Sequence, residues 1–236
     1  MRQPVNDSMV SAIIVAAGKG TRMGPNIDKL FLEVAGRPVV AHAWRRLVQA
    51  NDIDEIVVVV RDGMQEAFAE LAEAHDLCKP HRIVVGGAER QDSVWNGLQA
   101  LAHGTEIVAI QDGARPCTSG EIITATIAAA RGVGAAVAAQ AVTDTIKESS
   151  DGMLISRGLD RGKLWAVQTP QTFQVGLIRE ALMLVREKGL QVTDDAAACE
   201  LIGQPVRLVS SATPNPKVTV PADLPYVEMV LKRMEA

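Results

Sequence analysis

Short apolar segments of β-forming residues alternate along this chain with longer segments in which apolar residues recur at helical spacing. This alternation is typical of a βαβ series, in which a parallel sheet is covered by helices on both faces. The segments expected to be strands are residues 10–15, 55–60, 82–85, 106–110 and 135–139. The segments expected to be helices are residues 38–50, 63–75, 90–101 and 119–131. The predicted fold is a Rossmann-like, doubly wound α/β fold with a mostly parallel sheet.

Size and composition narrow the class of protein. With 236 residues and 47% hydrophobic content, the chain can bury one full core. We expect a disordered tail at residues 1–9 and a single domain over residues 10–236. The net charge of −4 argues against a broad nucleic-acid-binding surface. The start of the chain lacks the apolar stretch of a signal peptide, and we expect a cytoplasmic protein with no membrane partner.

The loop after the first predicted strand is rich in glycine and in cations. Gly18, Gly20 and Gly24 are spaced as G-x-G-x-x-x-G, and Met23 stands where a dinucleotide fingerprint needs its third glycine. The loop also lacks the Gly-Lys-Ser/Thr sequence that precedes the helix of a P-loop ATPase. Both a hydride-transfer enzyme and a P-loop ATPase are therefore disfavoured.

Two interpretations of this loop remain open. Its backbone N–H groups can turn toward a polyphosphate, which the nearby Lys19, Arg22 and Lys29 would neutralise. Alternatively, the loop is a tight surface turn whose cations are solvated. Because ligands of parallel sheets bind beyond the carboxyl ends of the strands, the position of this loop favours a phosphate site.

Residues 142–169 interrupt the helical pattern. Segments 145–148 and 153–156 flank a Ser-Ser-Asp-Gly sequence at 149–152, which is typical of a hairpin turn. An isolated hairpin is marginally stable in water, so this one requires cover. That cover is either a partner subunit or the hairpin's own domain, and the sequence leaves both possibilities open.

Several motifs resemble those of a known family. Residues 16–23 (AAGKGTRM), with KLFL at 29–32 and GRP at 36–38, resemble the opening signature of the sugar-nucleotide transferase superfamily, whose members join a nucleoside triphosphate to a sugar phosphate. Further motifs stand in the order found in 2-C-methyl-D-erythritol 4-phosphate cytidylyltransferases: QDGARP at 111–116, VTDTIK at 142–147, LDR at 159–161, LWAVQTPQ at 164–171, TDD at 193–195, and KVT at 217–219 followed by PADL at 221–224.

The resemblance implies a reaction and its site. CTP and methylerythritol phosphate would give the CDP-linked polyol and pyrophosphate, with Mg²⁺, in non-mevalonate isoprenoid biosynthesis. The residues implied as catalytic are Arg22, Lys29 and Lys217. Those implied for CTP are Ala16, Ala17, Gly18, Gly20, Gly87, Ser93 and Asp112. Those implied for the polyol phosphate are Asp112, Arg115, Thr145, Arg161, Thr169, Thr193 and Lys217. Asp112 is also the candidate metal contact, although Mg²⁺ would be held mainly by the CTP phosphates.

The family also implies a homodimer. Thr145 and Arg161 would reach across to the polyol phosphate of the neighbouring site, so that residues 142–169 form a dimerisation arm. For other positions, local structure offers a second interpretation. Ser93 can cap a helix, and residues 193–195 can begin one. Asp112 can simply favour a turn.

One departure from the family pattern concerns the triphosphate lysine. The usual Pro-Lys-Gln-Tyr is replaced by Asp28-Lys29-Leu30-Phe31. A carboxylate at Asp28 disfavours a bound triphosphate unless it points away. Two alternative functions remain. One is ribitol 5-phosphate cytidylyltransferase, and the other is a non-catalytic nucleotide-binding regulator, which would not need Lys29, Asp112, Arg161 and Lys217 together.

Overall fold

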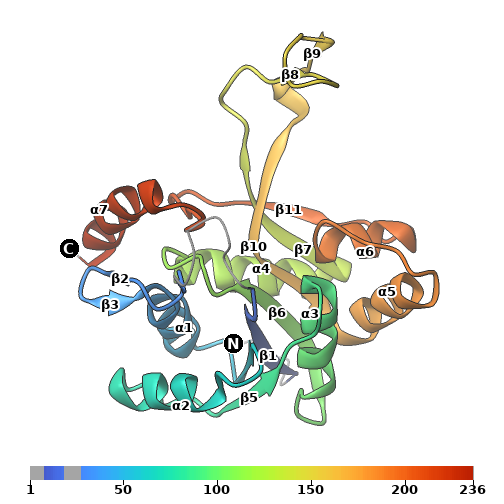
Figure 1. Ribbon diagram of the computed structural model, residues 1–236. Helices are drawn as coiled ribbons and strands as arrows, with labels where there is room; N and C mark the ends of the chain where they lie inside the picture. Colours follow the sequence, from blue (N-terminus) through green and yellow to red (C-terminus); the bar gives the residue numbers. More distant parts are fainter. Residues whose placement is uncertain (1–7, 19–27, 236) are drawn as a thin grey trace, which may run out of the picture.

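A seven-stranded sheet forms the centre of the molecule (Figure 1). The computed structural model describes residues 8–18 and 28–235. The sheet has the order β11-β7-β10-β6-β1-β4-β5, and β10 is the strand in it that runs antiparallel to its neighbours. Its strands are β1 (Met9–Ala16), β4 (Glu55–Val60), β5 (His81–Val85), β6 (Thr105–Asp112), β7 (Ala135–Ala141), β10 (Trp165–Gln174) and β11 (Arg207–Ser210). The predicted doubly wound, mostly parallel α/β fold is confirmed.

Helices cover both faces of the sheet, because successive side chains of a strand point to opposite sides. Along β1, Ile14 packs in one buried cluster with Trp44, whereas Ile13 packs in the other with Leu98. The first cluster includes residues of α1 (Val39–Gln49), α2 (Gln65–Ala74) and α4 (Gly120–Val133). The second includes residues of α3 (Arg90–Gln99), α5 (Val175–Glu187) and α6 (Asp195–Leu201). In the described parts of the chain, no helix has the length and apolarity needed to span a membrane.

Capping side chains and glycines mark the ends of helices, as α4 illustrates. Ser119 is the N-cap of α4, and its side chain accepts a hydrogen bond from the Ile122 backbone N–H. The same helix ends at Gly134, whose positive φ of 92° suits a residue without a β-carbon. The five predicted strands and four predicted helices are confirmed, with ends that shift by one or two residues.

Strand β10 was not predicted, and its composition explains why. It contains Gln168, Gln171 and Thr172, which are polar yet buried. Their side chains are paired: the amide nitrogen of Gln171 donates to Asp194 at 2.9 Å, and the Thr172 hydroxyl donates to Thr126 at 3.1 Å. A search for apolar segments misses a strand in which several of the buried side chains are amides and hydroxyls.

A small third cluster lies beside the main cores. It joins the hairpin of β2 (Glu33–Val34) and β3 (Arg37–Pro38) to the C-terminal helix α7 (Leu224–Glu235), and Figure 1 shows α7 lying over this hairpin. Val218, Val227 and Leu231 are fully buried within it. Because Val218 is anchored in this cluster, the backbone on either side of it has a fixed position.

The segment between β7 and β10 projects from the body as an arm (Figure 1). Near its outer end, β8 (Lys147–Glu148) pairs antiparallel with β9 (Arg157–Gly158). The predicted hairpin is therefore confirmed, but the prediction that its second strand spans residues 153–156 is wrong. The Asp151 carboxylate accepts hydrogen bonds from the N–H groups of Met153 (2.8 Å) and Leu154 (2.9 Å), which holds these residues in a bend instead of a ladder.

Candidate active site

A cavity lies at the edge of the sheet where the parallel strands end, the usual ligand position in this architecture. It is lined by the end of β1, the segment before β2, the start of α3, the end of β6 and the segment after β11. The lining residues are Val15, Ala16, Ala17, Gly18, Lys29, Leu30, Gly87, Ala88, Glu89, Arg90, Ser93, Asp112, Ala114 and Lys217. The structure thus brings together the described residues expected to contact CTP, along with both described lysines expected to be catalytic.

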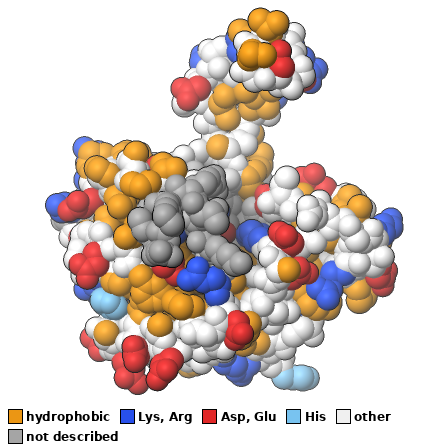
Figure 2. All heavy atoms as spheres, in the orientation of Figure 1, with side chains coloured by type: hydrophobic (Ala, Val, Ile, Leu, Met, Phe, Trp, Pro, Cys, Tyr) orange, Lys and Arg blue, Asp and Glu red, His pale blue; other side chains and the backbone are white. Residues whose placement is uncertain are grey.

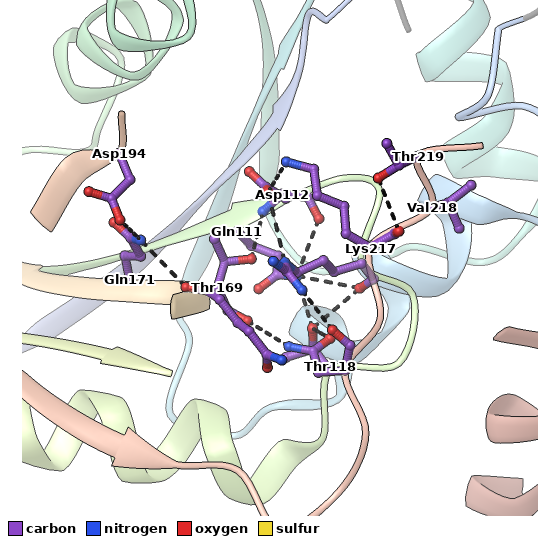
Figure 3. A network of polar contacts seen from close by, with 12 residues as sticks. Gln111, Asp112, Thr118, Thr169, Gln171, Asp194, Lys217, Val218 and Thr219 are labelled. Atoms are coloured by element: carbon purple, nitrogen blue, oxygen red, sulfur yellow. Dashed lines mark hydrogen bonds and ion pairs between the residues drawn. The ribbon is translucent and has the colours of Figure 1, made fainter. Parts of the chain in front are cut away.

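The carboxylate of Asp112 lies among three cations, and Figure 3 shows one of them, Lys217, beside it. Lys217 Nζ donates to it at 2.7 Å, Arg90 Nε lies at 3.4 Å, and Arg115 Nε at 3.9 Å. Burial by itself would raise the pKa of Asp112, but the attraction of Arg90, Lys217 and Arg115 outweighs it and lowers the pKa below its ordinary value. Asp112 is therefore a buried carboxylate that stays ionised.

Arg90 is shared between two carboxylates. Besides its contact with Asp112, it donates two parallel hydrogen bonds to Asp195, at 2.9 and 2.8 Å. The Asp195 side chain is only 1% exposed, and this burial raises its pKa while the neighbouring guanidinium opposes that rise. Burial would lower the pKa of Arg90, but the two carboxylates together raise it. Arg90 is thus a permanent cation that ties α3 to both β6 and α6.

Lys217 and Lys29 are brought to the same cavity by one backbone unit. The N–H of Val218 donates to the Ala114 carbonyl at 2.8 Å, which fixes the Lys217 segment beside the loop after β6. The carbonyl of Val218 accepts a hydrogen bond from Lys29 Nζ at 3.0 Å. Two lysines that are far apart in sequence therefore line the same cavity as Asp112.

A layer of buried polar groups lies beneath Asp112 (Figure 3). The Asp112 backbone N–H donates to the Thr169 hydroxyl at 3.1 Å. Asn215 is 1% exposed. Its side-chain amide donates to the Thr169 backbone carbonyl at 2.8 Å, and its own backbone carbonyl accepts from Arg115 at 2.7 Å. This layer connects the loop after β6, strand β10 and the segment before Lys217, and so sets the direction in which Asp112 points.

The glycines after β5 allow a close approach of chain segments. A β-carbon on Gly86 would lie 2.6 Å from the β-carbon of Ala17, and one on Gly87 would lie 2.3 Å from that of Asp92. The N–H of Gly87 donates to the Ser93 hydroxyl at 3.1 Å. Helix α3 is capped by Glu89 in a capping box with Asp92, so the alternative interpretation of Ser93 as the cap is wrong.

The remaining predicted residues lie in three places. Thr193 precedes Asp194, the N-cap of α6, whose side chain accepts from the Ala197 N–H at 2.9 Å; the predicted helix start is confirmed, and Thr193 does not line the cavity. Thr145 and Arg161 belong to the arm between β7 and β10 and are not among the residues that line the cavity of their own chain. Gly20 and Arg22 fall outside the described residues.

Sequence reasoning missed Arg90, Asp195 and Asn215 as members of this site. One available signal was the position of Arg90 at the first turn of a helix, where a cation opposes the helix dipole and requires an acidic partner. No local pattern could supply that partner, since Arg90 and Asp195 are 105 residues apart in sequence.

A glycine-containing loop after β1, two converging lysines and a buried ionised aspartate at the carboxyl edge of a Rossmann-like sheet define the nucleotidyltransferase class. Comparison with known proteins identifies the family. Residues 10–233 match the family model described as IspD: 2-C-methyl-D-erythritol 4-phosphate cytidylyltransferase. The chain therefore belongs to the 2-C-methyl-D-erythritol 4-phosphate cytidylyltransferase family.

Curated relatives with that name are similar over nearly the whole chain. The protein of Pelotomaculum thermopropionicum is 43% identical over 94% of this chain and 94% of its own length. That of Desulforamulus reducens is 44% identical over 95% of this chain and 96% of its own length.

Solved structures agree with the sequence comparison. The 4-diphosphocytidyl-2C-methyl-D-erythritol synthase of Anaerococcus prevotii aligns with a TM-score of 0.84 at 32% identity, covering 96% of this chain and 97% of that one. The 2-C-methyl-D-erythritol 4-phosphate cytidylyltransferase of Thermus thermophilus aligns with a TM-score of 0.76 at 32% identity, covering 95% and 99%.

The buried Arg90–Asp195 pair gives a stability prediction. Arg90→Met leaves the Asp195 carboxylate buried without its cation, and we expect the free energy of unfolding to fall by about 3–5 kcal/mol. The double variant Arg90→Met/Asp195→Asn removes the stranded charge, and it should recover at least half of that loss. Urea denaturation of both variants measures this. A single variant within about 1 kcal/mol of the wild type would contradict the assigned pairing.

Proposed function

We propose that the cavity binds CTP and that Lys29, Lys217 and Asp112 carry out the transfer of its cytidylyl group. The family reaction joins CTP to 2-C-methyl-D-erythritol 4-phosphate, giving 4-diphosphocytidyl-2-C-methyl-D-erythritol in the non-mevalonate route to isoprenoid precursors. The observation that carries the residue assignment is the convergence of two lysines on one cavity beside an ionised carboxylate.

The reaction needs alignment and charge stabilisation rather than a protein nucleophile. An oxygen of the substrate phosphate forms a bond to the α-phosphorus of CTP, and the bond from that phosphorus to the β-phosphate oxygen breaks. The bonding electrons leave with pyrophosphate. Negative charge on the nonbridging oxygens is therefore what the site has to stabilise.

The two lysines supply fixed positive charge at different points of this transfer. We assign Lys217 to the α-phosphate and the attacking phosphate, because its ammonium group is anchored by Asp112 at 2.7 Å while 37% of its side chain stays exposed to the cavity. We assign Lys29 to the leaving phosphates, because it belongs to the segment that follows the glycine loop. An ammonium that is already oriented needs no reorganisation as charge develops.

Asp112 orients rather than reacts. Its low pKa keeps it ionised, so it holds Lys217 in place and has carboxylate oxygen available for the hydroxyl groups of the polyol. Arg115 and Thr169 contact the same aspartate, which supports their assignment to the polyol phosphate side of the site. On this assignment, Asp112 lies between the nucleotide and its acceptor.

We propose Mg²⁺ as the cofactor, held mainly by the CTP phosphates. Within residues 8–18 and 28–235, no group of three or more His, Cys, Asp or Glu side chains could form a metal cage. Asp112 is an ionised oxygen donor in the cavity, which fits a magnesium ion that shares its ligands with phosphate and water. When bound, the ion supplies charge neutralisation on the triphosphate.

The cytosine ring is assigned to the segment around Gly87 and Ser93. The Ser93 hydroxyl accepts from Gly87 and donates to the Glu89 carbonyl at 3.2 Å, so this loop is tightly held. Ala16, Ala17 and Gly18 line the same cavity. Small side chains and exposed backbone groups allow a flat base to approach closely.

We also propose that the arm forms a homodimer. Its outer bend exposes three large apolar residues, Met153 at 83%, Leu154 at 74% and Ile155 at 68%, and Figure 2 shows hydrophobic side chains gathered at the outer end of the arm. Exposed apolar side chains on a two-stranded projection need a partner surface. A second copy would place Thr145 and Arg161 of the arm near the polyol phosphate of its neighbour.

The lysine assignment predicts a loss of turnover. Lys217→Ala and Lys29→Ala should each lower kcat at least about 100-fold in a pyrophosphate-release assay with CTP, Mg²⁺ and methylerythritol phosphate, because their charge stabilises the transition state. Ribitol 5-phosphate in place of the acceptor should give no release. Lys188→Ala, at the exposed end of α5, is the matched control with unchanged rates. Near-normal turnover of both lysine variants would refute the assignment.

The dimer proposal predicts a change in mass. Leu154→Asp places a charge in the apolar bend, and light scattering should show a shift from dimer to monomer at micromolar concentration. Glu148→Gln, on the neighbouring strand β8, is a control that adds no charge to the apolar surface. A wild-type protein that is monomeric at this concentration would overturn the proposal.

A further inference from the structure

Asp28, the residue immediately before Lys29, has both carboxylate oxygens hydrogen-bonded within the protein. Oδ1 accepts a hydrogen bond from the Leu30 N–H at 3.1 Å, and Oδ2 accepts one from Arg61 Nη2. Lys29 and Leu30 line the cavity, whereas Asp28 and Arg61 do not. The carboxylate that would otherwise repel a triphosphate is therefore turned toward an arginine.

Arg61 reaches Asp28 because of its place in the sheet. It directly follows β4, a strand parallel to β1 and adjacent to it, and so it emerges at the same edge as the cavity. The two side chains are 27% and 22% exposed. An ion pair so far removed from water is screened less by salt than one on the open surface.

The residues after Asp28 are also fixed. Leu30 is 3% exposed in the main core, and the Phe31 ring contacts the Phe68 ring edge to face at 5.2 Å. The Phe31 N–H closes the turn on the Asp28 carbonyl at 3.1 Å. Lys29 thus extends from a turn that is held by the packing of Leu30 and Phe31 and by a backbone hydrogen bond, none of which involves Arg61.

We propose that Arg61 is a positioning residue for nucleotide binding. By holding the Asp28 carboxylate, it neutralises a negative charge beside the triphosphate site. This inference rests on the proposed function, in which Lys29 contacts the CTP triphosphate. Arg61 does not itself touch the substrate.

The inference predicts a specific kinetic pattern. Without Arg61, the Asp28 charge repels the triphosphate in the ground state and in the transition state alike. A loss of that kind raises KM and leaves kcat nearly unchanged. Since the repulsion acts on the nucleotide, KM for CTP should change, and KM for methylerythritol phosphate should not.

The test is a double-mutant cycle in the full-length enzyme, measured by pyrophosphate release. Arg61→Gln should raise KM for CTP about 5- to 10-fold, and Asp28→Asn alone should change it less than about 2-fold. Asparagine keeps the Oδ1 atom that accepts from Leu30 but carries no charge. The double variant Asp28→Asn/Arg61→Gln should therefore return KM for CTP to within about 2-fold of the wild type. Arg61→Lys should retain most of the affinity.

Two controls distinguish a specific role of Arg61 from a general effect of losing an ion pair, and distinguish failure of this inference from failure of the proposed function. Arg82→Gln removes another ion-paired arginine, at the opposite edge of the sheet beside Glu55, and should leave KM for CTP unchanged. An unchanged KM in Arg61→Gln, or a double variant as impaired as the single one, would overturn the inference. If instead Lys29→Ala binds and turns over CTP normally, the proposed triphosphate site fails, whatever Arg61 does.

Discussion

The active site depends on one buried carboxylate, that of Asp112, and on the cations that neutralise it. A charge removed from water is tolerated only with well-placed partners, and here Arg90, Arg115 and Lys217 provide them. These partners come from the start of α3, the loop after β6 and the segment after β11. The cation cluster can form only when these segments have docked at the carboxyl edge of the sheet, so completing the fold and assembling the site are the same event.

Strand β10 connects this centre to the arm. Its inner half lies between β6, which ends at Asp112, and β7, and its outer half continues along β7 to the point where the arm begins. Thr169 lies in the middle of the strand and accepts the hydrogen bond of the Asp112 backbone. In the proposed dimer, one continuous strand therefore links the subunit contact to the polar layer beneath Asp112. This arrangement accounts for a strand whose buried residues are polar, since they serve the site as well as the core.

The sequence predicted what depends on local pattern and missed what depends on distant partners. The apolar segments of β1, β4 and β6 and the helical spacing between them were sufficient for the fold, and the family motifs pointed to several residues that line the cavity but not to Arg90. Strand β10 was missed because its buried side chains are amides and hydroxyls. The Arg90–Asp195 and Asp28–Arg61 pairs join residues 105 and 33 positions apart, a relation that no local spacing encodes. Asp28 looked unfavourable in sequence because its partner was not visible there.

The central claim, that an ionised Asp112 organises the catalytic cations, is tested most directly by Asp112→Asn. Asparagine has nearly the same shape but no charge, so Lys217 loses its anchor while the backbone hydrogen bond to Thr169 remains. The measurement is kcat for pyrophosphate release, with circular dichroism to establish that the variant is folded. A folded variant with kcat lowered at least about 100-fold agrees with the account. A folded variant with wild-type kcat would contradict it.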